Sequence, residues 1–155
     1  MQLNEHNKKE YPPMHTAEHL LNQTMKRLFG CERSKNSHIE RKKSKCDYFL
    51  AHEPTTEQIR NIEKQVNEVI SQNLPVRSCL IDKNNTPDNI DLSKLPDNAS
   101  QTLRLIFIGE YDSCACIGDH VKNTAEIGQF KIISTDFAEG KLRLRFKLEN
   151  CNYTE

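Results

Sequence analysis

Residues 141–148 alternate strictly between charged and apolar side chains. The charged positions are Lys141, Arg143, Arg145 and Lys147, and the apolar positions are Leu142, Leu144, Phe146 and Leu148. Successive side chains of a β-strand point to opposite faces, so a period of two predicts a half-buried strand. Residues 130–135 before Glu139-Gly140 predict the other arm of a hairpin. The segment therefore requires a sheet with one face against a core.

Two earlier segments show the period of a helix instead. Between Met14 and Phe29 the apolar residues recur about every 3.6 positions, after Pro12-Pro13 and before Gly30. A second helix is predicted to begin after Pro54-Thr55-Thr56 and to end at Asn73-Leu74-Pro75. Its apolar stripe consists of Ile59, Ile62, Val66, Val69 and Ile70. Both helices should bury one face.

The remaining segments predict short strands and loops. Strands are expected at 48–50, 76–81 and 103–108, and residues 109–118 are expected to be irregular. Residues 82–101 are rich in Asn, Asp, Pro and Ser, which predicts a long loop of the kind that is often functional. Helices and strands do not alternate regularly, so the predicted fold is α+β: a mixed or antiparallel sheet packed against two main helices.

Composition limits the architecture and the partners. A chain of 155 residues suits one domain, which we place at 14–150 after a polar lead-in, 1–13. Lys plus Arg and Asp plus Glu number 22 each, so any contact with nucleic acid must come from a local basic patch. No segment has the roughly 20 apolar residues that span a membrane. The six irregularly spaced cysteines and the polar N-terminus favour the cytoplasm, with reduced thiols.

Two short motifs contain potential metal ligands. His15 and His19 are four residues apart, so on a helix they share one face. Cys116 and His120 have the same spacing in a segment with Gly118, which suits a turn. Three imidazoles and one thiolate would suit Zn²⁺. The alternatives are hydrogen-bonded or surface histidines and a buried thiol.

These residues and their neighbours resemble a known family, the editing domain shared by alanyl- and threonyl-tRNA synthetases and the free-standing AlaX proteins built from it. The family pattern is H-x-x-x-H followed about a hundred residues later by C-x-x-x-H. Three further segments agree: the first motif continued as His15 to Leu21; Ser37-His38-Ile39 with Lys43, Ser44 and Asp47; and His120 to Gly128, similar to H-V-x-x-T-x-E-I-G. The family usually has Thr before the last histidine, where this chain has Asp119. The short N-terminal segment before His15 favours the free-standing type.

The resemblance implies Zn²⁺ bound by His15, His19, Cys116 and His120. It also implies hydrolysis of the ester between a wrong amino acid and the 3′-terminal ribose of a tRNA, with the acceptor end as partner. The leading substrates are Ser- or Gly-tRNA(Ala), and ATP is not expected. One alternative is another mischarged tRNA, such as tRNA(Thr). A second is a non-catalytic, zinc-containing module that binds aminoacyl-tRNA, which the exchange to Asp119 keeps open. The oligomeric state is not indicated.

Further residues are assigned candidate roles. His38 is a candidate general base, with a surface histidine as the alternative, and Asp119 is a candidate catalytic group or partner of a metal ligand. Thr16, Thr124 and Glu126 are candidates for the substrate pocket, or for structural roles. Glu18 is expected to cap or solvate its helix.

A cluster of basic residues follows the first predicted helix. Its members are Arg33, Lys35, Arg41, Lys42, Lys43 and Lys45. Basic clusters attract phosphate, so we predict that Arg41, Lys42, Lys43 and Lys45 contact tRNA, with a solvated loop as the alternative. Cys114 lies two residues before Cys116 and is expected to be a buried thiol at a strand end, or a substitute ligand.

Overall fold

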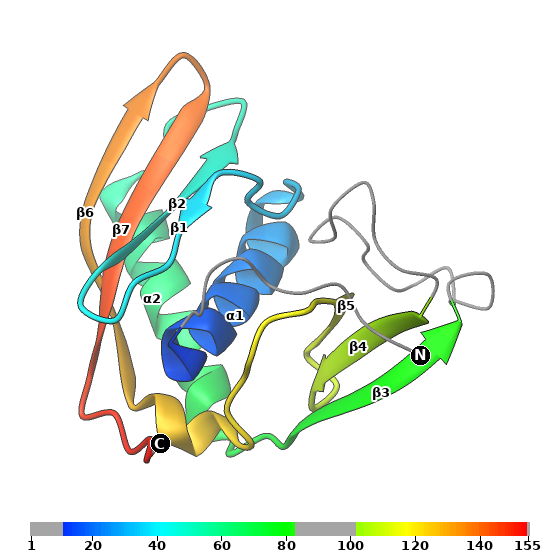
Figure 1. Ribbon diagram of the computed structural model, residues 1–155. Helices are drawn as coiled ribbons and strands as arrows, with labels where there is room; N and C mark the ends of the chain where they lie inside the picture. Colours follow the sequence, from blue (N-terminus) through cyan, green and yellow to red (C-terminus); the bar gives the residue numbers. More distant parts are fainter. Residues whose placement is uncertain (1–10, 83–101, 155) are drawn as a thin grey trace.

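The computed structural model describes residues 11–82 and 102–154, which form two helices and two antiparallel sheets (Figure 1). The elements are α1 (Pro12–Phe29), β1 (Ser37–His38), β2 (Ser44–Phe49), α2 (Thr56–Ser71), β3 (Val76–Asp82), β4 (Thr102–Ile108), β5 (Asp112–Ala115), the 3₁₀ turn η2 (Thr124–Ile127), β6 (Gln129–Ala138) and β7 (Lys141–Glu149). The predicted α+β domain with two main helices is confirmed. The predicted loop 82–101 lies, except for its first residue, outside the described residues.

Both helices lie close to their predicted bounds, but α1 begins at Pro12, two residues before the predicted start at Met14. The N–H of Gly30, which has a φ of 69°, donates to the Lys26 carbonyl and ends α1. Thr55 and Gln58 form a capping box at the start of α2: the Gln58 N–H donates to Thr55 Oγ1, and the Thr55 N–H donates to Gln58 Oε1. The stripe of α2 is buried from Ile62 to Ile70, whereas Ile59 is half-buried. Among the described residues no helix is long and apolar enough to cross a membrane.

The larger sheet has the strand order β1-β2-β7-β6 and packs one face on the core. The predicted hairpin is confirmed: β6 and β7 pair antiparallel, and Leu142, Leu144 and Phe146 of β7 are buried. Phe146 contacts Phe130 with ring centroids 5.1 Å apart. β2 is longer than the predicted strand and begins at Ser44. The alternation in β7 thus identified the covered face of this sheet correctly.

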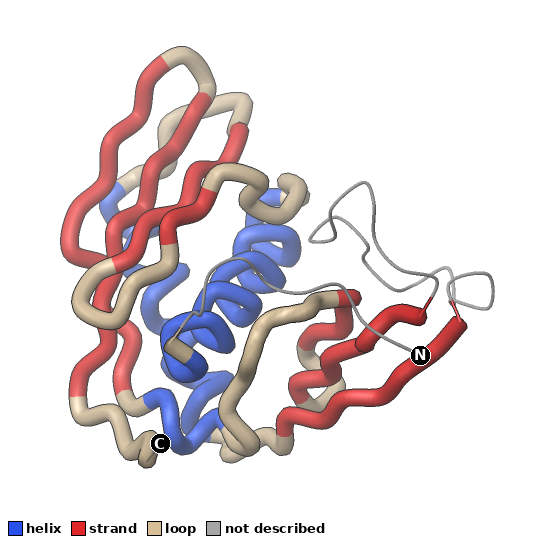
Figure 2. Tube along the Cα trace, in the orientation of Figure 1, coloured by secondary structure: helices blue, strands red, loops and turns tan. Residues whose placement is uncertain are grey.

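The smaller sheet, β3-β4-β5, lies on the other side of α1 (Figure 2). The prediction that residues 109–118 are irregular is wrong for β5, which pairs with β4 and places Cys114 opposite Ile106. The strand was not predicted because it begins with polar Asp112 and Ser113, and its pairing with β4 is a contact between separate segments. Since α1 lies between the two sheets, its first turns face the chain that leaves β5.

Asp47 joins the two inner strands of the larger sheet through an ion pair with the half-buried Arg143. Its carboxylate accepts from Arg143 Nε at 2.8 Å, Arg143 Nη2 at 3.0 Å and Asn36 Nδ2 at 2.7 Å. The hydrogen bonds from Arg143 hold the pKa of Asp47 below its usual value, although burial opposes this. The stability that Asp47 contributes is therefore present above its unfolded pKa of about 4, and it is lost as pH falls through the lower folded pKa.

We expect Asp47→Asn to lower the free energy of unfolding at pH 7 by about 2 kcal/mol, because charged hydrogen bonds are weakened. The difference from wild type should shrink as pH falls from about 4 through the lower folded pKa, because the unfolded and then the folded carboxylate of the wild type takes up a proton. Urea unfolding at a series of pH values measures this. A difference that stays constant down to pH 2 would contradict the assignment.

Candidate metal centre

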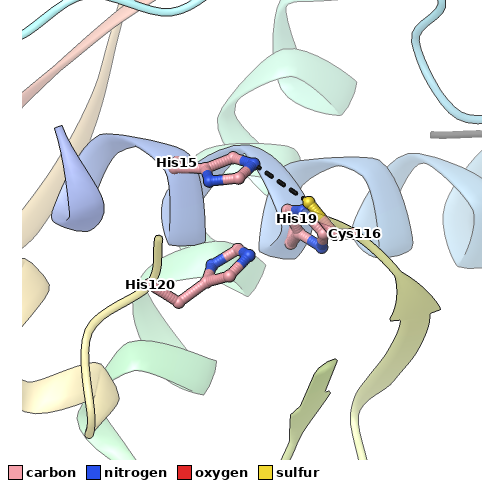
Figure 3. A group of neighbouring side chains, drawn as sticks. All are labelled: His15, His19, Cys116 and His120. Carbon is pink, nitrogen blue, oxygen red and sulfur yellow. Dashed lines mark hydrogen bonds between the residues drawn. The ribbon is translucent and has the colours of Figure 1, made fainter. Parts of the chain in front are cut away.

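Four ligand-type side chains meet beside the first turns of α1. His15 and His19 project from one face of the helix toward Cys116 and His120, which come from the chain after β5 (Figure 3). Their ligand atoms all lie within 4.8 Å of one another. The His15 and His120 rings are stacked, with centroids 4.2 Å apart, and His19 lies edge-on to both. The structure therefore brings together all four residues for which the sequence suggested a common ion.

Each histidine of this cluster has a partner for its Nδ1 atom. His15 Nδ1 donates to the Asp119 carbonyl at 2.9 Å, since a carbonyl can only accept. His120 Nδ1 lies 2.9 Å from Thr16 Oγ1, and His19 Nδ1 lies 3.2 Å from Cys114 Sγ. A proton on Nδ1 leaves the lone pair of Nε2 free for a ligand. This arrangement is typical of histidines that bind metal through Nε2.

The centre of the cluster contains polar atoms without partners. Nε2 of His19 and of His120 are buried and have no hydrogen-bond partner within residues 11–82 and 102–154. Cys116 Sγ lies 3.4 Å from His15 Nε2. Buried nitrogen atoms of this kind are rare in proteins, because each lost hydrogen bond costs free energy. A metal ion at the centre would satisfy them, so the residues fit an ion of the zinc type.

The environment favours the protonation states that metal binding needs at Cys116 and His120, but not at His19. Burial raises the pKa of the Cys116 thiol, but the neighbouring imidazoles of His120, His15 and His19 outweigh it and hold the pKa well below its usual value. Burial lowers the pKa of His120, and the neighbouring His15 and His19 lower it further. Burial also disfavours charge on His19, yet Cys114 and Asp112 raise its pKa above the usual value. A thiolate and a neutral His120 are the forms that bind metal.

Gly118 allows the chain after β5 to approach α1 closely. A Cβ atom at this position would lie 2.3 Å from His15 Cε1 and 2.7 Å from His15 Nδ1. The Gly118 carbonyl accepts from the Arg104 guanidinium, and the Val121 N–H donates to Thr16 Oγ1 at 3.2 Å. The first contact joins the segment from Cys116 to His120 to β4, and the second joins the residue that follows this segment to α1.

Two predicted residues contact the cluster in ways that the sequence did not specify. Asp119 contributes its main-chain carbonyl to His15, while the residue itself is exposed. Thr16 is buried and binds His120. The expectation that Glu18 caps or solvates the helix is wrong: its side chain is 1% exposed, with Oε1 3.9 Å from His15 Nε2. Glu18 is buried because α1 lies between two sheets, which the periodicity of one helix does not reveal.

Other predicted residues lie outside the cluster. His38 is exposed on β1, with Nε2 2.7 Å from Glu40 Oε1, beside a pocket of about 190 Å³. Thr124 Oγ1 donates to the Ile70 carbonyl and accepts from the Leu74 N–H. Glu126 accepts from the Lys122 and Asn123 N–H groups, which fixes the turn before η2. The catalytic role of His38 and the pocket roles of Thr124 and Glu126 stay predictions.

The residues of the predicted basic cluster differ in their exposure to solvent. Arg33 is buried and pairs with Asp112, so its inclusion in a surface patch is wrong. Lys35, Arg41, Lys42 and Lys43 are exposed, and Lys45 is half-buried. Arg41 lies over the Tyr11 ring at 4.3 Å from its centroid. The predicted tRNA contacts Arg41, Lys42, Lys43 and Lys45 are therefore on or near the surface.

The fold and the cluster define a class of protein: a small α+β domain whose buried histidines and cysteine could hold a metal ion. Comparison with known proteins narrows this class. Residues 103–145 match the model of the threonyl and alanyl tRNA synthetase second additional domain. The match includes Cys116 and His120.

Three relatives are alanine–tRNA ligases. That of Caldicellulosiruptor saccharolyticus is 35% identical over 121 residues, which is 77% of this chain and 14% of the ligase. That of Methanococcus maripaludis is 30% identical over 148 residues, 93% of this chain and 17% of the ligase. That of Aeropyrum pernix is 31% identical over 137 residues, 85% of this chain and 15% of the ligase. This chain is an AlaX-like editing domain, and it spans about a sixth of these relatives or less.

Proposed function

We propose that this protein is a zinc-dependent hydrolase that deacylates mischarged tRNA, with Ser- or Gly-tRNA(Ala) as its leading substrates. The observation that supports this most is the buried cluster of His15, His19, Cys116 and His120, with Nε2 of His19 and His120 unsatisfied. The similarity to the second additional domain of threonyl and alanyl tRNA synthetases supports charged tRNA as the substrate class.

The proposed roles follow from the contacts. His15, His19, Cys116 and His120 would hold the ion, which polarises a carbonyl or lowers the pKa of a bound water. Thr16 orients the His120 ring through Nδ1, and the Asp119 carbonyl orients the His15 ring in the same way. Arg41, Lys42, Lys43 and Lys45 would contact tRNA phosphates. The acceptor end would bring the ester to the cluster.

A second function is favoured by the number of ligands. Four protein ligands close a tetrahedral shell, which is the arrangement of structural zinc sites, whereas catalytic sites keep one position open. A closed shell would suit a module that binds aminoacyl-tRNA without hydrolysing it. Deacylation of another mischarged tRNA, such as one for threonine, is the other alternative.

Deacylation of Ser-tRNA(Ala), with zinc content determined on the same sample, separates these functions. We expect hydrolysis at about one zinc ion per chain. Binding of this tRNA without hydrolysis, at full zinc content, would favour the non-catalytic module. Hydrolysis of mischarged tRNA(Thr) alone would keep the chemistry and change the substrate. Absence of metal even after zinc is added would refute the proposal.

The same assay tests the basic residues. Lys42→Gln/Lys43→Gln should raise KM for charged tRNA and leave kcat and zinc content unchanged, because both residues are exposed. Lys131→Gln/Lys147→Gln on the β6-β7 hairpin is the control, with a similar loss of charge in a different place. Equal effects of both pairs would show attraction by general charge only.

A further inference from the structure

Asp112 on β5 lies beside the Nδ1 atom of His19. Its side chain is 1% exposed, and its Oδ2 lies 3.5 Å from His19 Nδ1. The other oxygen, Oδ1, accepts from the Arg33 guanidinium and, at 2.9 Å, from Gln23 Nε2. Two donors therefore hold the carboxylate by Oδ1, and Oδ2 is left directed at the histidine.

Arg33 makes this buried carboxylate possible. Its side chain is 2% exposed and faces Asp112 directly. A buried charge is expensive unless it is paired, and here the guanidinium and the carboxylate compensate each other. The side chains of Arg33 and Asp112 are enclosed by packing, so their relative orientation is more fixed than that of an ion pair on the surface. The pair can therefore hold a neighbouring ring in one orientation.

Two acceptors compete for the His19 Nδ1 proton. Cys114 Sγ is the nearer at 3.2 Å, but a thiol is a weak acceptor. Asp112 Oδ2 is an ionised carboxylate oxygen, which accepts more strongly. Asp112 Oδ2 has no hydrogen bond within the described residues, and its contact with His19 Nδ1 is a charge contact at 3.5 Å. The negative charge of the carboxylate and the absence of another hydrogen bond to Oδ2 both favour Asp112 as the acceptor of the His19 Nδ1 proton.

We propose that Asp112, held by Arg33, is a positioning residue for His19. It accepts the Nδ1 proton and thereby directs the Nε2 lone pair toward Cys116, His15 and His120. Partners of this kind orient metal-binding histidines and raise their basicity. The inference rests on the metal site of the proposed function and does not require deacylation.

Asp112→Asn tests the proposal sharply. Arg33 and Gln23 both donate, so they select the amide oxygen, and the amide NH₂ then faces the His19 Nδ1 proton. Two donors would face each other, and His19 would turn away from the cluster. We expect zinc affinity, measured by competition with a chelator, to fall about 10- to 100-fold. The visible spectrum of the Co²⁺-loaded protein should change as well.

Asp47→Asn is the matched control. Asp47 is also a buried aspartate that pairs with an arginine. It belongs to β2, its partner Arg143 belongs to β7, and neither residue is part of the cluster. Both variants should be less stable in the metal-free state, while only Asp112→Asn should lose zinc affinity. If Asp112→Asn does not fold, Arg33→Met/Asp112→Leu removes the acceptor without leaving a buried charge, and Asp47→Leu/Arg143→Met is its control.

The outcomes separate this inference from the proposed function. Zinc affinity unchanged in Asp112→Asn, or an equal loss in Asp47→Asn, would overturn the positioning role. A loss in Cys114→Ala as large as that in Asp112→Asn would make the thiol the partner, and would also overturn it. If wild type binds zinc without deacylating any mischarged tRNA, the proposed function fails, and a loss of affinity confined to Asp112→Asn still establishes the inference.

Discussion

Cys116→Ala is expected to leave the protein without bound metal. Cys116 supplies the one sulfur of the four-residue cluster, and its lowered pKa favours the thiolate, which binds metal ions. Loss of a thiolate removes both a bond and the negative charge that balances the ion. Zinc content should fall from about one ion per chain to nearly none after dialysis, and deacylation should fall at least about 100-fold.

Elemental analysis after dialysis measures the metal, and melting temperature in excess chelator shows whether the apo-protein still folds. Cys79→Ala is the control, since it removes an exposed thiol from β3. Unchanged zinc content in Cys116→Ala would show that the ion is bound elsewhere. The group of His19, Asp112 and Cys114 would then be the leading candidate for the metal site.

The parts of the fold that the sequence predicted are those in which local pattern and burial agree. The strict alternation of β7 identifies its buried face, and the stripe of α2 follows the helical period as far as Ile70. Both motifs with ligands four residues apart were also visible. The spacing within each motif does not show that the two motifs lie together in space, because this depends on the position of α1 between the two sheets. The family resemblance supplied that long-range information.

The features that were missed depend on contacts between distant segments. Arg33 was assigned to a surface patch because it stands in a basic stretch, yet it pairs with Asp112, 79 positions away. Glu18 was expected at the surface, since nothing in its helix indicates that both sides are covered. The strand β5 was missed for the same reason. Composition cannot show which charge will be buried when its partner lies on another element.

Gly118→Ala is expected to disrupt the metal centre without removing a ligand. The new Cβ would lie 2.3 Å from His15 Cε1, where the neighbouring ring has to move. Overpacking of this kind costs about 1–3 kcal/mol. Because His15 Nδ1 also donates to the Asp119 carbonyl next to Gly118, the displaced ring would lose the hydrogen bond that directs its Nε2. Zinc affinity should fall at least about 10-fold.

Gly30→Ala separates this effect from a general loss of stability. Gly30 has a φ of 69°, and an added Cβ there would meet no described atom within 4 Å. The left-handed backbone should cost about 1–2 kcal/mol, so the two variants are destabilised to a similar extent. Chelator competition should show weaker zinc binding in Gly118→Ala alone. Wild-type zinc affinity in Gly118→Ala would mean that His15 can move aside and still bind, and that the close approach of the two segments serves packing rather than the metal.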